Sequence, residues 1–132
     1  MVQSPCIIAV VDNDSRVLES LESLLESNGL KVRLFPSADE FLSSKALSKI
    51  DCLISDIGMP DVSGMNLLAI IRQETPHIPV ILITGRPVHE SAEYYTAQGA
   101  HAFFLKPFDG RALLNSVREA IEARQGLPPK PL

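Results

Sequence analysis

The chain has 132 residues and a mass of 14.4 kDa, which fits one domain large enough to bury a hydrophobic core. Hydrophobic residues make up 45% of it and charged residues 21%, a balance that excludes a disordered chain. Twelve basic against sixteen acidic side chains give a net charge of −4, which argues against nucleic-acid binding. We expect no membrane span and no signal peptide. Cys6 and Cys52 lie in apolar runs and are expected to be buried, reduced thiols of a cytoplasmic protein.

Five short apolar runs recur at intervals of roughly 20–30 residues, the spacing that parallel strands joined by crossover helices require. Most runs are continuously apolar, as strands buried on both faces of a sheet are. The second run alternates between polar and apolar residues, so we expect it at an edge of the sheet. The predicted strands are 6–11, 31–35, 52–55, 80–83 and 102–105.

The stretches between and after these runs have helical apolar spacing and helix-end signals. Ser37, followed by Glu40 three residues later, forms a capping box. Asp109 is the expected N-cap of the last helix. The predicted helices are centred on 17–25, 41–42, 67–71, 90–98 and 113–121, and the fourth is the least apolar.

This order of elements predicts a flavodoxin-like, three-layer (βα)5 fold, a five-stranded parallel sheet between two layers of helices. We take the strand order 2-1-3-4-5 by analogy with known five-stranded folds of this kind. Residues 1–125 are expected to form the domain, and 126–132 a Pro-rich tail or linker. Neither glycine-rich fingerprint of nucleotide-binding folds is present, so no nucleotide cofactor is expected.

Four of the five predicted strands are followed by polar side chains that chemistry could use: Asp12, Asp56, Thr84 and Lys106. The carboxyl ends of parallel strands meet at one edge, and ligands bind there. Two facing carboxylates favour a hard cation such as Mg²⁺ between them. Together with an ammonium and a hydroxyl, they suit phosphoryl transfer. Asp14 either joins this cluster from the loop or only caps the next helix.

Three segments in order resemble the receiver domain of two-component response regulators, most closely the FixJ type. The strongest is 55–65, SDIGMPDVSGM, and the others are Ile83–Gly85 and Phe104–Phe108. The resemblance implies a signalling domain, not an enzyme, in which Asp56 accepts a phosphoryl group from a histidine kinase.

The resemblance also implies roles for the neighbours of Asp56. Asp12, Asp56 and the backbone carbonyl of Gly58 would hold Mg²⁺. Lys106, in a cis bond to Pro107, and Thr84 would bind the phosphate. Phe103 would move inward with Thr84 and change the face formed by the fourth helix, fifth strand and fifth helix. That face, which carries Tyr95, His101 and Phe103, would then support self-association or contact an output domain.

One position departs from the family pattern: the second of two adjacent acids after the first strand is Asn13 here. An amide oxygen can coordinate Mg²⁺ but brings no charge, so metal affinity should fall. A degenerate receiver that binds partners without phosphorylation is therefore an alternative. A small phosphatase of the haloacid dehalogenase class is another, because 10–14 and Ile83–Thr84 resemble its first two motifs, with Asp12 as nucleophile.

Overall fold

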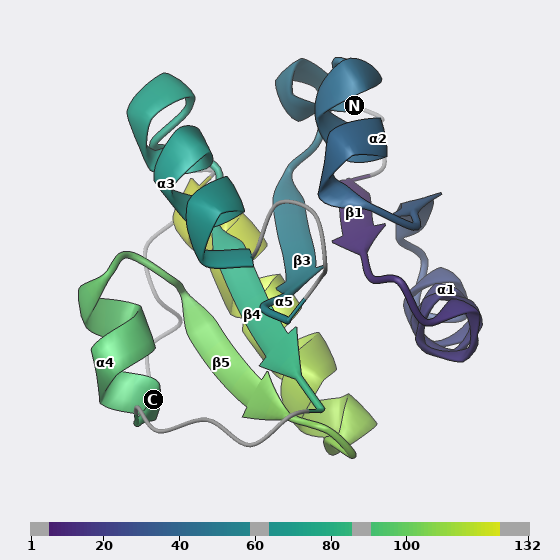
Figure 1. The fold of residues 1–132 in the computed structure, drawn as a ribbon. Coiled ribbons are helices and arrows are strands. Elements are labelled where there is room, and N and C mark those ends of the chain that lie inside the picture. The colour runs from purple at the N-terminus through teal and green to yellow at the C-terminus, as the bar shows by residue number, and fades with distance from the viewer. Residues whose placement is uncertain (1–5, 59–63, 86–90, 125–132) are drawn as a thin grey trace.

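The computed structural model describes residues 6–58, 64–85 and 91–124. Five parallel strands form a single sheet, and helices connect them (Figure 1). The elements in chain order are β1 (Ile7–Val11), α1 (Ser15–Glu26), β2 (Lys31–Phe35), α2 (Ala38–Ser43), the 3-10 helix η1 (Ala46–Lys49), β3 (Cys52–Asp56), α3 (Gly64–Glu74), β4 (Val80–Thr84), α4 (Ala92–Ala97), β5 (Ala102–Leu105) and α5 (Gly110–Arg124).

The strand order is β2-β1-β3-β4-β5, and each neighbouring pair of strands is parallel, so the predicted topology is confirmed. The central strands β3 and β4 are buried throughout, which explains their continuously apolar sequences. The alternating run became β2 at an edge, as expected, and its exposed positions hold Lys31 and Arg33. Charged side chains on an edge strand discourage pairing with other chains.

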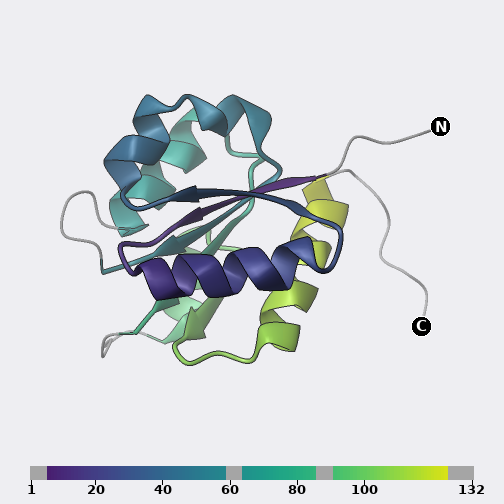
Figure 2. The same ribbon diagram turned by 90° about the vertical axis from the view of Figure 1, so that its right-hand side faces the viewer.

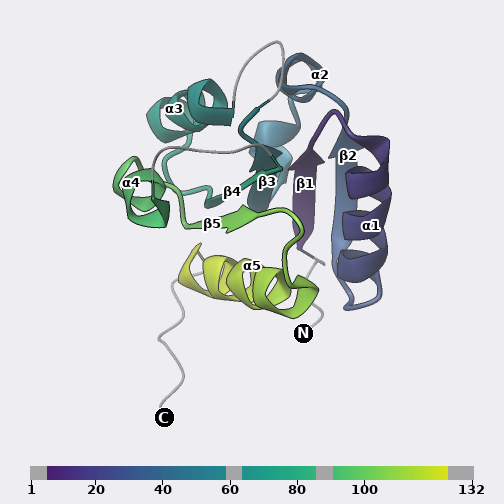
Figure 3. The same ribbon diagram turned by 60° about the horizontal axis from the view of Figure 1, so that its bottom comes forward.

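Two hydrophobic cores lie on opposite faces of the sheet, because successive strand side chains point to opposite sides. One core joins Ala9, Leu53 and Leu82 of the strands to α2, α3 and α4. The other joins Ile8, Ile54 and their neighbours to α1 and α5. Figures 2 and 3 show α1 and α5 on one side of the strands, with α2 and α3 on the other. This is the predicted three-layer arrangement.

The helix ends largely follow the sequence signals. The Ser37 hydroxyl accepts a hydrogen bond from the backbone N–H of Glu40 at 3.1 Å, which is one half of the expected capping box. The Asp109 carboxylate accepts from the N–H of Arg111 at 2.9 Å, as an N-cap does. After α1, Gly29 adopts φ +84°, a left-handed conformation that ends the helix.

Three expectations need correction. The fourth helix covers Ala92–Ala97, shorter than the predicted 90–98. The 3-10 helix η1 was not predicted. Cys6 is half-buried because it precedes β1, whereas Cys52 is fully buried, and burial raises the pKa of its thiol to about 12. The Pro-rich segment 126–132 lies outside the described residues, and among those described no helix is long and apolar enough to span a bilayer.

Candidate functional site

The polar residues predicted to cluster do meet at one edge of the sheet, formed by the carboxyl ends of the strands. Asp12 directly follows β1, Asp56 and Thr84 end β3 and β4, and Lys106 directly follows β5. Asp12, Asp56 and Thr84 are all buried, and Asp12 has no exposed surface. Since β1 and β3 are neighbours in the sheet, their two carboxylates lie beside each other at the switch point.

The ammonium of Lys106 joins the two carboxylates. Its Nζ lies 2.7 Å from Oδ2 of Asp12 and 3.4 Å from Oδ2 of Asp56. The second oxygen of each carboxylate accepts a backbone N–H at 2.9 Å, from Asp14 for Asp12 and from Gly58 for Asp56. The Lys106–Pro107 peptide bond is cis, as the resemblance implied. One ammonium is therefore shared by two facing carboxylates and offsets part of their negative charge.

Burial and charge act against each other in this cluster. Burial raises the pKa of Asp12 above its ordinary value, and the nearby Asp56 charge adds to this. The hydrogen bonds from Lys106 and from the N–H of Asp14 oppose that shift. For Lys106, burial acts to lower the pKa, but the hydrogen bond to Asp12 and the two carboxylate charges raise it overall. The ammonium is thus held firmly charged.

Asp14 does not join the cluster with its side chain. Its carboxylate accepts from the backbone N–H of Arg16 at 2.9 Å and pairs with the Arg16 guanidinium at 3.2 Å. The side-chain hydrogen bond with Arg16 lowers the pKa of Asp14. Asp14 is the N-cap of α1. Of the two roles considered for it, capping the helix is therefore the one that the structure shows, and joining the cluster is not.

The chemistry of the site fits a hard divalent cation only in part. The carboxylates of Asp12 and Asp56 are the oxygen donors that Mg²⁺ prefers, and Gly58 lies next to Asp56. Asn13 is exposed and brings no charge. Among the described residues, no group of three or more His, Cys, Asp or Glu side chains is placed to hold a metal. Two carboxylates whose repulsion is offset by one lysine can still accept a dication.

Phe103, the expected switch aromatic, packs against Tyr95, which we expected on the outer face. Phe103 of β5 stacks on Tyr95 of α4, with ring centroids 4.5 Å apart and planes 19° apart. Tyr95 is only 5% exposed, so its predicted place on the outer face is wrong. Its neighbour Tyr94 faces solvent instead, 44% exposed, which confirms that one of the two tyrosines does so.

The remaining singled-out residues do not enter the site. His101 is exposed in the link just before β5, and His77 is exposed in the link that precedes β4, so neither lies at the carboxyl edge. His89 lies outside the described residues. Leu105, at the end of β5, is the other large apolar side chain with high exposure, 54%, in the part of the chain that the structure describes.

This fold and this edge define a class of α/β domain: a doubly wound, five-stranded parallel sheet with an acidic pair and a lysine at its switch point. The model of the response regulator receiver domain family matches residues 8–118. The chain belongs to this family.

Curated relatives place the chain near the FixJ type. It is 38% identical to the response regulator protein TodT of Pseudomonas putida over 116 residues, which are 88% of this chain and 51% of that protein. It is 37% identical to the transcriptional regulatory protein FixJ of Azorhizobium caulinodans over 121 residues, 90% of this chain and 57% of FixJ. The chain spans about half the length of the curated relatives it matches.

Solved structures agree with the fold. A receiver domain from Clostridium thermocellum has a TM-score of 0.84 at 32% identity, covering 91% of this chain and 97% of its own. The crystal structure of FixJ-N has a TM-score of 0.78 at 28% identity, covering 97% of this chain and 100% of its own. The beryllofluoride-activated NtrC4 receiver domain dimer has a TM-score of 0.81 at 27% identity, covering 89% and 98%. The predicted family and fold are confirmed.

Proposed function

We propose that this domain accepts a phosphoryl group from a histidine kinase on Asp56, and that phosphorylation changes its association with partners. The observation that carries the proposal is the carboxylate of Asp56 at the end of central strand β3, beside Asp12 and within 3.4 Å of the Lys106 ammonium. In the transfer, a carboxylate oxygen of Asp56 forms a bond to phosphorus as the phosphorus–nitrogen bond of the phosphohistidine breaks. The imidazole leaves and the phosphoryl group stays on Asp56. The domain itself serves as an acceptor, not as an enzyme.

Asp56 suits the acceptor role better than Asp12. The Asp56 side chain is 10% exposed, whereas that of Asp12 is fully covered. Both oxygens of Asp12 already accept hydrogen bonds, one of them at 2.7 Å from Lys106. Both oxygens of Asp56 also accept hydrogen bonds, but its contact with Lys106 is longer, at 3.4 Å. An attacking nucleophile must reach the phosphorus atom, so the covered Asp12, held closely by Lys106, disfavours the phosphatase alternative.

Lys106 and Thr84 would receive the phosphate. A phosphoryl group on Asp56 adds oxygens that accept strong, charge-assisted hydrogen bonds. Lys106 needs only to turn from Asp12 toward Asp56, because its Nζ already lies between the two. Thr84 ends the strand next to β3, and its hydroxyl would donate to a phosphate oxygen. The ammonium neutralises negative charge and the hydroxyl donates a hydrogen bond at the point where that charge develops.

Mg²⁺ would be held by Asp12, Asp56 and the Gly58 carbonyl, with Asn13 as a weak fourth oxygen donor. The ion would supply positive charge that draws the phosphodonor's oxygens to the site. Because Asn13 is neutral and exposed, we propose a weaker metal site than two adjacent acids would give. The oxygen-only donor set supports Mg²⁺ over softer metals.

The association surface would be the α4-β5-α5 face, used either by a second copy or by an output domain. Its exposed apolar side chains, Tyr94 and Leu105, are the observation that supports it. The related NtrC4 receiver is described as a dimer in its beryllofluoride-activated form. We propose a cytoplasmic setting, with no nucleic-acid binding and no membrane contact by this domain. Two free cysteines fit a reducing compartment.

A degenerate receiver that binds partners without phosphorylation is the second candidate. The observation that favours it is the short contact of Lys106 with Asp12, together with the missing charge at Asn13. In that case the ammonium would permanently fill the cation's role at the acidic pair.

Labelling with acetyl phosphate and Mg²⁺, followed by intact-mass measurement and peptide mapping, tests the proposal. We expect one phosphoryl group on Asp56, no labelling of Asp56→Asn, and normal labelling of the control Asp39→Asn, which changes an exposed acid of α2. No labelling of the parent chain would favour the degenerate receiver. Turnover with label on Asp12 would favour the phosphatase.

A second measurement tests the change in association. Sedimentation of the parent and of Phe103→Ala is compared with and without beryllofluoride, a phosphoryl analogue. If the stacked ring transmits the signal, Phe103→Ala keeps Asp56 labelling but loses the analogue-dependent shift. Equal shifts in both proteins would show that Phe103 only packs the core and that the signal travels elsewhere.

A further inference from the structure

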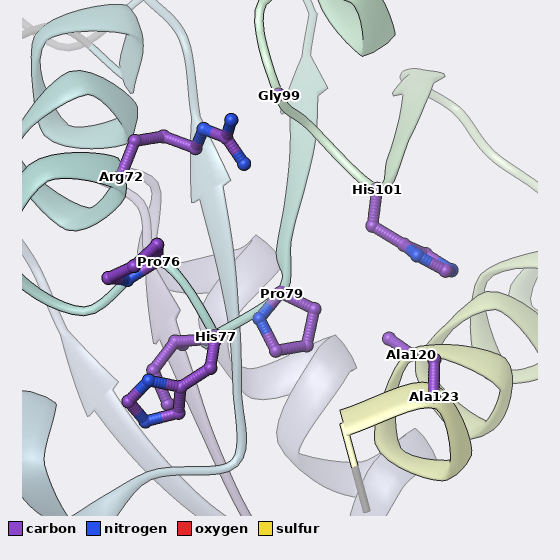
Figure 4. A pocket seen from close by; sticks show the side chains of 9 residues that line it. Arg72, Pro76, His77, Pro79, Gly99, His101, Ala120 and Ala123 are labelled. Atoms are coloured by element: carbon purple, nitrogen blue, oxygen red, sulfur yellow. The ribbon is translucent and has the colours of Figure 1, made fainter. Parts of the chain in front are cut away.

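A pocket of about 340 Å³ lies at the opposite edge of the sheet from Asp56. It is bounded by the last turns of α3 and α5 and by the links that enter β4 and β5 (Figure 4). Its lining combines three basic side chains with small and apolar residues: Arg72, His77 and His101, and Pro76, Ile78, Pro79, Gly99, Ala120 and Ala123.

The charge of this pocket differs from that of the whole chain. The chain carries more acidic than basic side chains, 16 against 12, yet none of the described residues that line the pocket is acidic. Within 6–58, 64–85 and 91–124, the side chains of Arg72, His77 and His101 make none of the hydrogen bonds or ion pairs found in the structure. Their donors are thus free to meet a ligand from three separate elements.

Arg72 is positioned by packing instead of by a polar partner. Its side chain extends from α3 across the link at Gly99, as Figure 4 shows. A Cβ atom at Gly99 would lie 2.5 Å from Nε of Arg72, and Gly99 itself has φ +110°. Glycine is therefore required here both by the backbone conformation and by the arginine that lies over it. The guanidinium is held at the rim of the pocket with its donors unpaired.

A simpler explanation covers only part of the cluster. A cation in the last turn of a helix is favoured by the helix dipole, which accounts for the type of residue at Arg72. It does not account for His77 and His101, which lie outside that helix, nor for the small residues Ala120 and Ala123 that leave the space open.

We propose that this pocket binds an oxyanion, a carboxylate or phosphate group, carried by a ligand with an apolar body. The guanidinium of Arg72 presents a planar fork of donors that matches two oxygens of such a group. The imidazoles of His77 and His101 add donors from the two strand links. The apolar body lies against Pro79 and the alanines of α5.

Titrations of the full chain with four probes test this proposal. Binding is monitored at one fixed pH by the NMR signals of the His77 and His101 imidazoles. The probes are inorganic phosphate, acetate, hexanoate and hexanol. We expect millimolar binding of hexanoate, weaker binding of acetate and no binding of hexanol. Saturation by phosphate as tightly as by hexanoate would show that the oxyanion alone is recognised and would overturn the apolar body of the ligand. Saturation by hexanoate alone would identify a carboxylate on an apolar body.

Matched variants assign the site. Arg72→Gln should weaken the binding of the anion about tenfold, the loss that removal of one charged hydrogen-bonding partner gives. Arg72→Lys keeps the charge but lacks the planar fork of donors, so its affinity for the anion should lie between those of the parent and Arg72→Gln. The control Arg111→Gln changes an exposed arginine of α5 outside the pocket and should leave binding unchanged. No saturable shift with any anion, or equal binding by Arg72→Gln and the parent, overturns the proposal.

Discussion

Lys106→Met removes the ammonium that joins the two site carboxylates and keeps an unbranched stem in its place. Exposed ion pairs contribute about 0–1 kcal/mol, whereas removing one partner of a buried pair costs about 3–5 kcal/mol. Lys106 lies between these cases, since its side chain is 18% exposed and that of Asp12 is fully covered. We therefore expect a loss of about 1–3 kcal/mol near neutral pH. For a domain of this size each kcal/mol lowers Tm by about 4 °C.

The same change should alter the response to pH in a defined direction. Burial holds the pKa of Asp12 above its ordinary 3.8, so the folded state binds more protons than the unfolded state in the window above that value. Stability therefore falls as pH rises through this window and recovers as pH falls. Without the ammonium the pKa of Asp12 is raised further. The stability that Lys106→Met loses relative to the parent should therefore shrink as pH is lowered toward about 4.

Thermal unfolding followed by circular dichroism measures both effects, with and without Mg²⁺. Since the dication can replace the missing charge, Mg²⁺ should raise the Tm of Lys106→Met more than that of the parent. The control Lys49→Met removes an exposed lysine from η1 and should change little. A Lys106→Met protein as stable as the parent at neutral pH, with no extra response to Mg²⁺, would refute this account of the site.

Three further changes have defined outcomes. Asp12→Asn should raise stability by about 1 kcal/mol in metal-free buffer, because it relieves a buried and repelled charge, and should abolish stabilisation by Mg²⁺ in the same unfolding assay. Asn13→Asp should tighten Mg²⁺ binding in a calorimetric titration, since it adds a carboxylate beside the site, and equal affinity would count against this position as a ligand. Tyr95→Ala should cost about 3 kcal/mol in urea unfolding, and Tyr94→Ala less than about 1 kcal/mol, because only the first ring is buried and stacked.

The fold could be predicted because its signals are local and repeated. Each buried strand is a short apolar run, and each is followed by a stretch with helical spacing and a cap such as Ser37 or Asp109. Right-handed crossovers then leave few topologies. The site followed from the same reasoning, since parallel strands must bring Asp12, Asp56 and Thr84 to one edge.

What the sequence did not predict depends on contacts between distant elements. The 3-10 helix η1 begins after Lys45, whose φ of +59° is unusual for a residue with a side chain and has no sequence signal. The burial of Tyr95 depends on Phe103 in the next strand, and helical spacing alone could not choose between Tyr94 and Tyr95. The closer approach of Lys106 to Asp12 than to Asp56 is a matter of tenths of an ångström, which no motif specifies.

The parallel topology that assembles the acidic edge also assembles the basic one. If every strand ends at Asp56's edge, every strand begins at the other, where the links into β4 and β5 carry His77 and His101. Strands of four or five residues separate the two edges by roughly 15 Å at ~3.3 Å per residue. An anion beside Arg72 therefore cannot contact a phosphoryl group on Asp56. Because the two sites share no residue, anion binding and Asp56 labelling are measured separately, and failure of one proposal leaves the other standing.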